Sequence, residues 1–214
     1  PAQCHFIDIP DGATARKEAN ILAKRALEIL DQKSMLKNAD ELLNWPGRLQ
    51  RISLSSGHNL ILEAAHTPTG LEKILPELIN LINSEYSTEK TCLIFGTSPQ
   101  QDMSAMLKGI ATMCDKIGGV ELFLTKPHGC RYPGVEPNNL LKYPWPTLDI
   151  HQYPHVKQAL DMLLARDPEE CGTILSIGSL YLQGNILTYL GQDGDDELSL
   201  IPKNSNVVGH SKAD

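Results

Sequence analysis

The stretch "LILEAAHTPTG", residues 60–70, decides the fold, because its pattern takes a buried strand directly into a helix. The run is apolar at 60–62, and Thr67 followed by Pro68 is the pattern of a helix N-cap with proline at the first helical position. His66 is therefore expected at the strand-to-helix corner, near Glu63. The residues alone leave two interpretations open: a functional pair, or a solvated Glu63 beside a His66 that hydrogen-bonds a backbone carbonyl.

Outward from this stretch, the hydrophobic period changes repeatedly between that of a strand and that of a helix. Strands are predicted at 49–54, 60–65, 91–96, 119–125 and 172–179, and helices at 14–32, 68–84, 101–114, 154–166 and 180–190. The first two strands predict a hairpin, residues 126–146 a Pro-rich loop, and Pro76 a kink or break in its helix. The fold class is therefore α/β, with a Rossmann-like, mainly parallel sheet, helices on both faces and an N-terminal hairpin.

Composition limits the function. The chain has 214 residues, 41% of them hydrophobic, and a net charge of -7 without a run of lysines or arginines, which argues against a nucleic-acid partner. No apolar stretch approaches the roughly 20 residues that cross a bilayer, and no signal-peptide pattern opens the chain, so we expect a soluble, cytoplasmic protein. Its five cysteines are widely spaced without a C-x-x-C pair, which predicts reduced, inert thiols, neither a disulfide framework nor a zinc site.

Ligands of open parallel sheets bind beyond the carboxyl ends of the strands, where helix N-termini favour anions. Here those ends are expected at 63–67, 96–102, 125–131 and 178–179. The third leads into a loop that carries Lys126, His128 and Arg131. These side chains would either meet an anionic substrate or belong to a plain connection, and the sequence does not decide between the two.

Five segments in order carry a resemblance to a known family: "WPGRLQRI" at 45–52, "LILEAAHTPTGLE" at 60–72, "LIFGTSPQQDMSAML" at 93–107, "ELFLTKP" at 121–127 and "IGSLYLQGNIL" at 177–187. Their order and spacing resemble the carboxy-terminal domain of folylpolyglutamate synthases and dihydrofolate synthases, in the Mur ligase superfamily. The resemblance implies an ATP-dependent ligase that adds glutamate to a folate through an acyl phosphate.

The resemblance also implies roles for single residues. Arg48, in the family's P-G-R turn, would approach the ATP phosphates or ribose, and Glu63 would take the ribose contact. His66 would belong to the same nucleotide site and lie close to the reacting groups as the catalytic histidine, and Ser179 would lie toward the incoming amino acid. Glu63 stands where the family has aspartate, and Gln101 stands beside Asp102 where many relatives have lysine.

The same resemblance implies the partners: ATP with Mg²⁺, L-glutamate, and folate or dihydropteroate. No G-x-x-x-x-G-K-[ST] phosphate loop occurs in the sequence, and the chain begins at Pro1. We therefore expect a fragment that is inactive alone, with ATP and Mg²⁺ bound mainly by a central ATPase domain outside it.

Three parts are predicted: residues 1–44 as the end of the central ATPase domain or a linker helix, 45–190 as the Mur ligase-like domain, and 191–214 as a polar tail. We expect a monomer. Two alternatives stay open. One is a non-catalytic Rossmann-like binding module, which the departures at Glu63 and Gln101 keep open. The other is a peptidoglycan Mur ligase domain, against which the segment "GSLYLQGNIL" favours the folate ligases.

Overall fold

A computed structural model describes residues 4–31, 46–147 and 149–192. Its centre is a six-stranded sheet in the order β1-β2-β6-β3-β4-β5. β1 pairs with β2 in antiparallel fashion, and all other neighbours are parallel. The strands are β1 (Arg48–Ser53), β2 (Asn59–Glu63), β3 (Thr91–Phe95), β4 (Glu121–Thr125), β5 (Ile150–Tyr153) and β6 (Thr173–Ile177). The mainly parallel α/β sheet and its N-terminal hairpin are thus confirmed.

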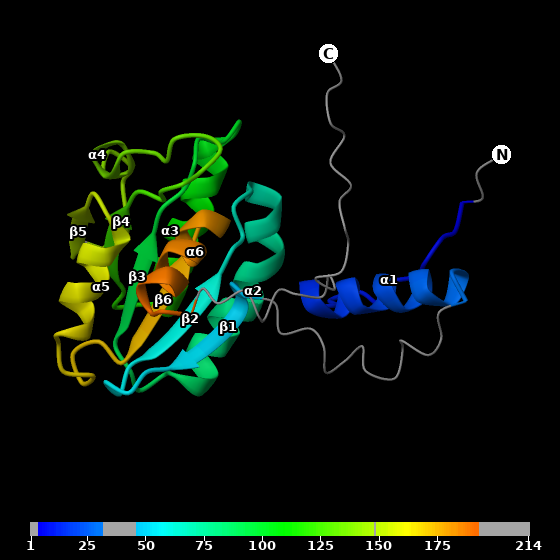
Figure 1. Ribbon diagram of the computed structural model, residues 1–214, viewed down its shortest axis with the longest axis horizontal. Helices are drawn as coiled ribbons and strands as arrows, with labels where there is room; N and C mark the ends of the chain where they lie inside the picture. Colours follow the sequence, from blue (N-terminus) through cyan, green and yellow to red (C-terminus); the bar gives the residue numbers. More distant parts are fainter. Residues whose placement is uncertain (1–3, 32–45, 148, 193–214) are drawn as a thin grey trace, which may run out of the picture.

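Helices cover both faces of this sheet (Figure 1). The helices of the described residues are α1 (Ala15–Ile29), α2 (Pro68–Glu85), α3 (Met103–Ile117), α4 (Pro137–Leu140), α5 (Val156–Leu164) and α6 (Leu180–Tyr189). One core lies between the sheet and α2 with α3, and a second lies between the opposite face and α5 with α6. β3, β4 and β6 are buried at every position because helices cover both of their faces.

The strand-to-helix corner after β2 forms as predicted. The Thr67 hydroxyl accepts a hydrogen bond from the Gly70 backbone N–H at 3.1 Å, and Pro68 is the first residue of α2. Asp102 caps α3 in the same way, through the Ala105 N–H at 2.9 Å. Each cap satisfies a backbone donor that the helix itself leaves unpaired.

The prediction of a break at Pro76 is wrong, whereas that of a kink stays a prediction. α2 runs without interruption through Pro76 from Pro68 to Glu85. Pro76 and Glu72 are both exposed, so solvent can hydrogen-bond the carbonyl that loses its helical donor. The buried residues on the other side of α2, Leu71, Ile74, Leu75, Leu78, Leu81 and Ile82, hold the helix against the sheet.

Two short elements in the region after β4 were not predicted. α4 has only four residues, and β5 is a four-residue edge strand that pairs with β4 alone. Short elements carry too few residues for a recognisable period.

α1 stands to one side of the layered body in Figure 1. An ion pair at 2.8 Å between Glu18 and Lys73 of α2 links it to that body. Leu22, Ile29 and Leu30 of its apolar stripe are exposed. The boundary predicted after residue 44 stays a prediction, and both the 32–45 connection and the predicted 191–214 tail, from residue 193 on, lie outside the described residues. Among the described helices, none is long and apolar enough to cross a membrane.

Candidate functional site

The carboxyl edge of the sheet brings several of the predicted site residues together. β2 ends at Glu63, which lies opposite Ile177 at the end of the neighbouring β6. Ser179 follows β6 as the N-cap of α6, and Arg48 at the start of β1 pairs with Glu63 across the hairpin. One rim of the sheet therefore carries Arg48, Glu63 and Ser179.

The Glu63 side chain is buried, so the interpretation of a solvated carboxylate is wrong. Its Oε1 accepts hydrogen bonds from the Ala65 backbone N–H at 2.8 Å and from Arg48 Nη1 at 3.4 Å, while Oε2 accepts from the Leu49 N–H at 3.0 Å. Burial raises the pKa of Glu63 above its usual value, although the two backbone donors and Arg48 oppose that shift. The carboxylate thus crosslinks the two ends of the hairpin.

The backbone opposite Glu63 is irregular. The β1–β2 register shifts between Arg48 and Gln50, so Leu49 forms a β-bulge. Leu49 has a φ of 47°, which is left-handed and rare for a branched apolar residue. Gly47, two residues before Leu49, has a φ of 71°. Its N–H donates to Gln50 Oε1 at 2.8 Å, and its carbonyl accepts from the Ala64 N–H at 2.7 Å. The P-G-R turn is therefore fixed at several points, with Arg48 as the first residue of β1.

His66 lies just beyond the carboxylate, at the corner where it was predicted. Its Nδ1 is 2.9 Å from the carbonyl oxygen of Ala64, which favours the tautomer with the proton on Nδ1. The residue is exposed, so Nε2 is open to a ligand or to solvent. A hydrogen bond to a backbone carbonyl is what the non-functional alternative expected of His66. The catalytic role of His66 stays a prediction.

Gln183, on the first turns of α6, is a site residue that the sequence analysis missed. Its Nε2 donates to the carbonyl oxygens of Glu63 at 3.0 Å and Ser179 at 3.2 Å, and its side chain packs against Gly47. Gln183 is buried, and its Oε1 has no partner among the described residues. A polar residue on the buried side of an apolar helix, four positions after Ser179, is the signal that could have identified it.

Ser179 occupies the N-cap position of α6, yet its hydroxyl makes no capping hydrogen bond within the described part of the chain. The residue is only 3% exposed, and the first turn of α6 contains no acidic side chain. The N-terminal N–H groups of α6 are thus without a side-chain cap beside the carboxyl end of β6, an arrangement that suits a carboxylate or phosphate.

Two of the three side chains that were predicted to meet an anionic substrate in the loop after β4 have partners within the chain. Lys126 forms an ion pair with Glu136, and His128 bonds the Pro154 carbonyl at 3.0 Å and stacks on His155 at 4.2 Å. Arg131 is exposed, with its guanidinium 5.6 Å from the centre of the Tyr132 ring.

The contacts of this loop are made to residues other than Arg48 and Glu63. His128 is tied to α6 by Asn185, whose amide oxygen accepts the His128 N–H at 2.9 Å. Asp102 is the cap of α3, and Gln101 beside it is exposed. Within the part of the chain that the structure describes, no hydrogen bond or ion pair joins any of these residues to Glu63.

The opposite, amino edge of the sheet holds a second buried carboxylate that the sequence analysis did not single out. Glu121 accepts two hydrogen bonds from Arg166, at 2.7 and 2.8 Å, and its Oε1 is 2.8 Å from His151 Nε2. The Arg166 hydrogen bonds hold the pKa of Glu121 below its usual value. This cluster ties β4 and β5 to the end of α5.

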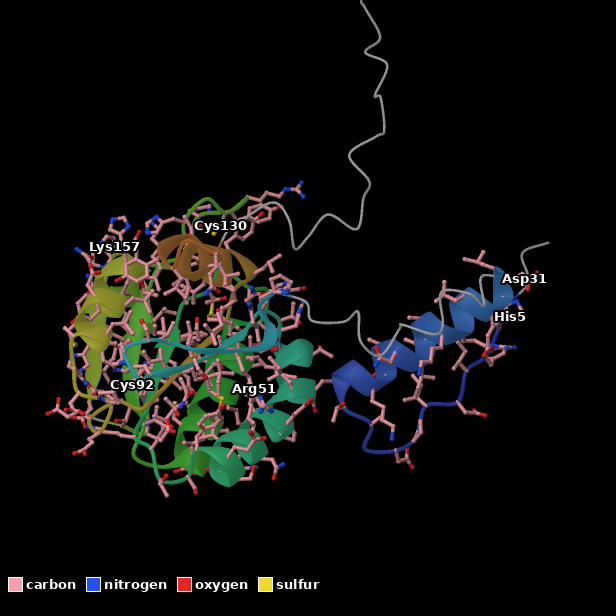
Figure 2. All side chains as sticks on the ribbon, turned by 60° about the horizontal axis from the view of Figure 1, so that its bottom comes forward. His5, Asp31, Arg51, Cys92, Cys130 and Lys157 are labelled. Atoms are coloured by element: carbon pink, nitrogen blue, oxygen red, sulfur yellow. The ribbon has the colours of Figure 1, made fainter. Side chains whose placement is uncertain are left out.

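The cysteines are free thiols. Cys92 lies inside the body, whereas Cys130 lies on the loop after β4 (Figure 2). A hydrogen bond with Cys171, together with burial, raises the pKa of Cys92, and burial raises that of Cys114 to about 12. Thiols protonated to that extent are poor nucleophiles. No group of three or more His, Cys, Asp or Glu residues is placed to hold a metal in the part of the chain that the structure describes.

Comparison with known proteins adds a fold relationship. No protein-family model and no curated protein sequence matches the chain. Among solved structures, the chain is similar to the bifunctional folylpolyglutamate synthase/dihydrofolate synthase of Yersinia pestis complexed with AMPPNP and Mn ion, at 18% identity and a TM-score of 0.55, covering 73% of this chain and 34% of that one. The chain has the fold of part of a folylpolyglutamate synthase.

A second similar structure of this fold is E. coli FolC in complex with DHPP and ADP, at 19% identity and a TM-score of 0.52, covering 69% of this chain and 31% of that one. A third is a bifunctional folylpolyglutamate synthase/dihydrofolate synthase with Mn, AMPPNP and L-glutamate bound, at 19% identity and a TM-score of 0.52. The chain spans about a third of the length of the folylpolyglutamate synthases that it matches.

Proposed function

We propose that this chain supplies one side of the active site of an ATP-dependent ligase that adds L-glutamate to a folate or to dihydropteroate. Solved structures with this fold are described with ADP, AMPPNP, manganese, DHPP and L-glutamate, ligands that such a reaction would use. The proposal includes a monomeric, cytoplasmic chain, and it makes residues 45–190 a ligase domain that works with a separate ATPase domain.

The observation that carries the proposal is the shared rim of Arg48, Glu63 and Ser179. Arg48 reaches Glu63 at 3.4 Å and is half exposed, and Gln183 links the Glu63 and Ser179 carbonyls through one amide. A fixed cation and an uncapped helix N-terminus at the carboxyl edge of a parallel sheet are suited to anionic substrates.

In the proposed reaction, a substrate carboxylate takes the terminal phosphoryl group of ATP, and the amine of glutamate then attacks the acyl phosphate and displaces inorganic phosphate. Arg48 would stabilise negative charge on the transferring phosphoryl group. Exposed Nε2 of His66 would accept or relay a proton beside it. Ser179 and the α6 N-terminus would hold the carboxylate of the incoming glutamate.

Mg²⁺ is not assigned to residues of this chain. The described residues provide no cluster of three metal-binding side chains, and the sequence has no phosphate-binding loop. The proposal therefore places both the metal and the main phosphate contacts in the separate ATPase domain.

A titration of the ¹⁵N-labelled chain, followed by NMR, tests the proposal. Millimolar MgATP should shift the resonances of Arg48, Ala65 and His66, and L-glutamate should shift those of Ser179 and Leu180. Arg48→Ala should abolish the MgATP-induced shifts. Arg51→Ala is the matched control, because Arg51 lies on the same strand but pairs with Glu85 at 2.7 Å, beside α2 in Figure 2.

Equal responses of the two arginine variants, or shifts confined to other parts of the sheet, would contradict the assignment. The non-catalytic binding module would then be favoured, because the rim would lack the cation that the proposed phosphoryl transfer needs.

A further inference from the structure

We infer that Glu63 is a positioning residue: it holds the Leu49 bulge and thereby presents Arg48 at the rim, and it makes no ligand contact of its own. This inference rests on the proposed function for the role of Arg48. It departs from the ribose contact that the family resemblance implies for this position.

The first argument is the occupancy of the carboxylate. Oε1 accepts from both the Ala65 N–H and Arg48 Nη1, and Oε2 accepts from the Leu49 N–H. The side chain is only 3% exposed. A ribose hydroxyl would have to reach a buried group whose two oxygens are already used to satisfy buried backbone donors.

The second argument is the backbone that Glu63 holds. Leu49 keeps a left-handed φ of 47°, a conformation that persists in a non-glycine residue only when its surroundings enforce it. The enforcing contacts are the Oε2 hydrogen bond to its N–H and the packing of its side chain against the α2–α3 core. A bulge of this kind re-aims the neighbouring side chain, here that of Arg48.

The third argument is the difference in exposure between the two charged partners. The Arg48 side chain is 49% exposed and its 3.4 Å contact to Oε1 engages one end of the guanidinium. The remaining N–H groups of that guanidinium can therefore meet an anion while Glu63 stays covered.

Two probes separate positioning from ribose contact: magnesium tripolyphosphate, which has no ribose, and MgATP. Each is titrated into the wild-type chain and into Glu63→Gln, with the shift of the Arg48 Nε–Hε resonance as the readout. Glutamine cannot accept at both of its terminal atoms, so the Ala65 or the Leu49 contact is lost while side-chain volume is kept. We expect the affinity for both probes to fall by the same factor, about fivefold.

A second variant, Leu49→Gly, tests whether the effect acts through the bulge, because glycine adopts a positive φ without strain. In the Glu63→Gln background it should recover part of the lost tripolyphosphate affinity, whereas Leu49→Ala should not. A merely structural role for Glu63, unconnected to Arg48, would give no such selective recovery. A fall in MgATP affinity with unchanged tripolyphosphate affinity would show a ribose contact and overturn the inference.

A separate readout judges the inference if neither probe moves Arg48 in the wild-type chain, a result that would count against the proposed function. The ¹⁵N relaxation of Arg48 Nε reports its order directly. Glu63→Gln should make the Arg48 side chain more mobile on the nanosecond timescale, and the Arg51→Ala variant should leave it unchanged. Unchanged Arg48 order in Glu63→Gln would overturn the positioning role on its own.

Discussion

The Glu63 carboxylate lies 3.0 Å from the backbone nitrogen of Leu49, the residue that bulges from the β1–β2 ladder with a left-handed φ of 47°. An alanine at this position would keep the backbone strain of a left-handed residue, about 1–2 kcal/mol, whereas glycine would not. Both substitutions lose the same packing of the leucine side chain against the core. The conformation of residue 49 therefore decides their order of stability.

We predict that Leu49→Gly is more stable than Leu49→Ala by about 1 kcal/mol in urea unfolding. The control pair is at Arg51, in the regular part of β1 opposite Ile61. There the order should reverse, with alanine more stable than glycine by roughly 0.5–1 kcal/mol. The same order at both positions would contradict a strained bulge.

The pKa shifts of the two buried carboxylates predict opposite dependences of stability on pH. Glu63 has its pKa raised by burial, so the folded chain binds its proton more tightly than the unfolded chain does. Its contribution to stability is complete below the unfolded pKa, near 4.5, and is lost as the pH rises through the raised pKa. The stability of wild type relative to Glu63→Gln should therefore decline as the pH rises above about 4.5.

Glu121 is the counterpart with the opposite sign, because the Arg166 hydrogen bonds lower its pKa. Its contribution is complete above the unfolded pKa and is lost as the pH falls through the lowered one. The stability of wild type relative to Glu121→Gln should thus decline below about pH 4.5. Urea unfolding of the three proteins between pH 3 and pH 8 checks both slopes, and parallel pH curves for the two variants would refute the assignment.

The layered fold could be predicted from the sequence because its signals are long. β3 and β6 each bury five consecutive residues, and Thr67 with Pro68 marks the start of α2 by two independent cues. β5 escaped prediction because it is a four-residue edge strand after a Pro-rich loop, too short to show a period.

The candidate site could be located but not described from the sequence. The strand end and helix start around residues 63–67 identify the rim, because they depend on local patterns. The burial of Glu63 depends on residues 14 and 15 positions away, Leu49 and Arg48, which only the hairpin brings near. A left-handed leucine has no sequence signature, since φ > 0 is expected at glycine or asparagine.

The Gln183 amide is predicted to couple the end of β2 at Glu63 to the start of α6 at Ser179. Gln183→Leu should destabilise the chain by about 1–3 kcal/mol, because the buried carbonyls of Glu63 and Ser179 lose a shared donor. Hydrogen exchange should accelerate at Ala65 and at the first turn of α6 before it does elsewhere. Gln158→Leu, on the exposed surface of α5, is the matched control and should change stability by less than about 0.5 kcal/mol. Equal effects of both leucine variants would remove Gln183 from the site.

α1 is predicted to open independently of the layered body. Its ion pair between Glu18 and Lys73 has a lysine that is about half exposed, and such pairs contribute at most about 1 kcal/mol. Lys73→Ala should change the free energy of global unfolding by less than about 0.5 kcal/mol. The α1 amides should exchange faster than those of β3 in both proteins. Protection of α1 equal to that of β3 would refute the domain boundary proposed after residue 44.

The chain alone is predicted neither to hydrolyse ATP nor to bind it tightly. Its sequence contains no G-x-x-x-x-G-K-[ST] loop, and Arg48 with His66 would offset only a small part of the entropy lost on binding. We expect a dissociation constant for MgATP near or above about 1 mM, equivalent to about 4 kcal/mol. Isothermal titration calorimetry and a phosphate-release assay measure both properties, with Arg51→Ala as the control for non-specific attraction. Binding in the micromolar range that survives Arg48→Ala would place a complete nucleotide site elsewhere on this chain and would overturn the shared active site proposed for it.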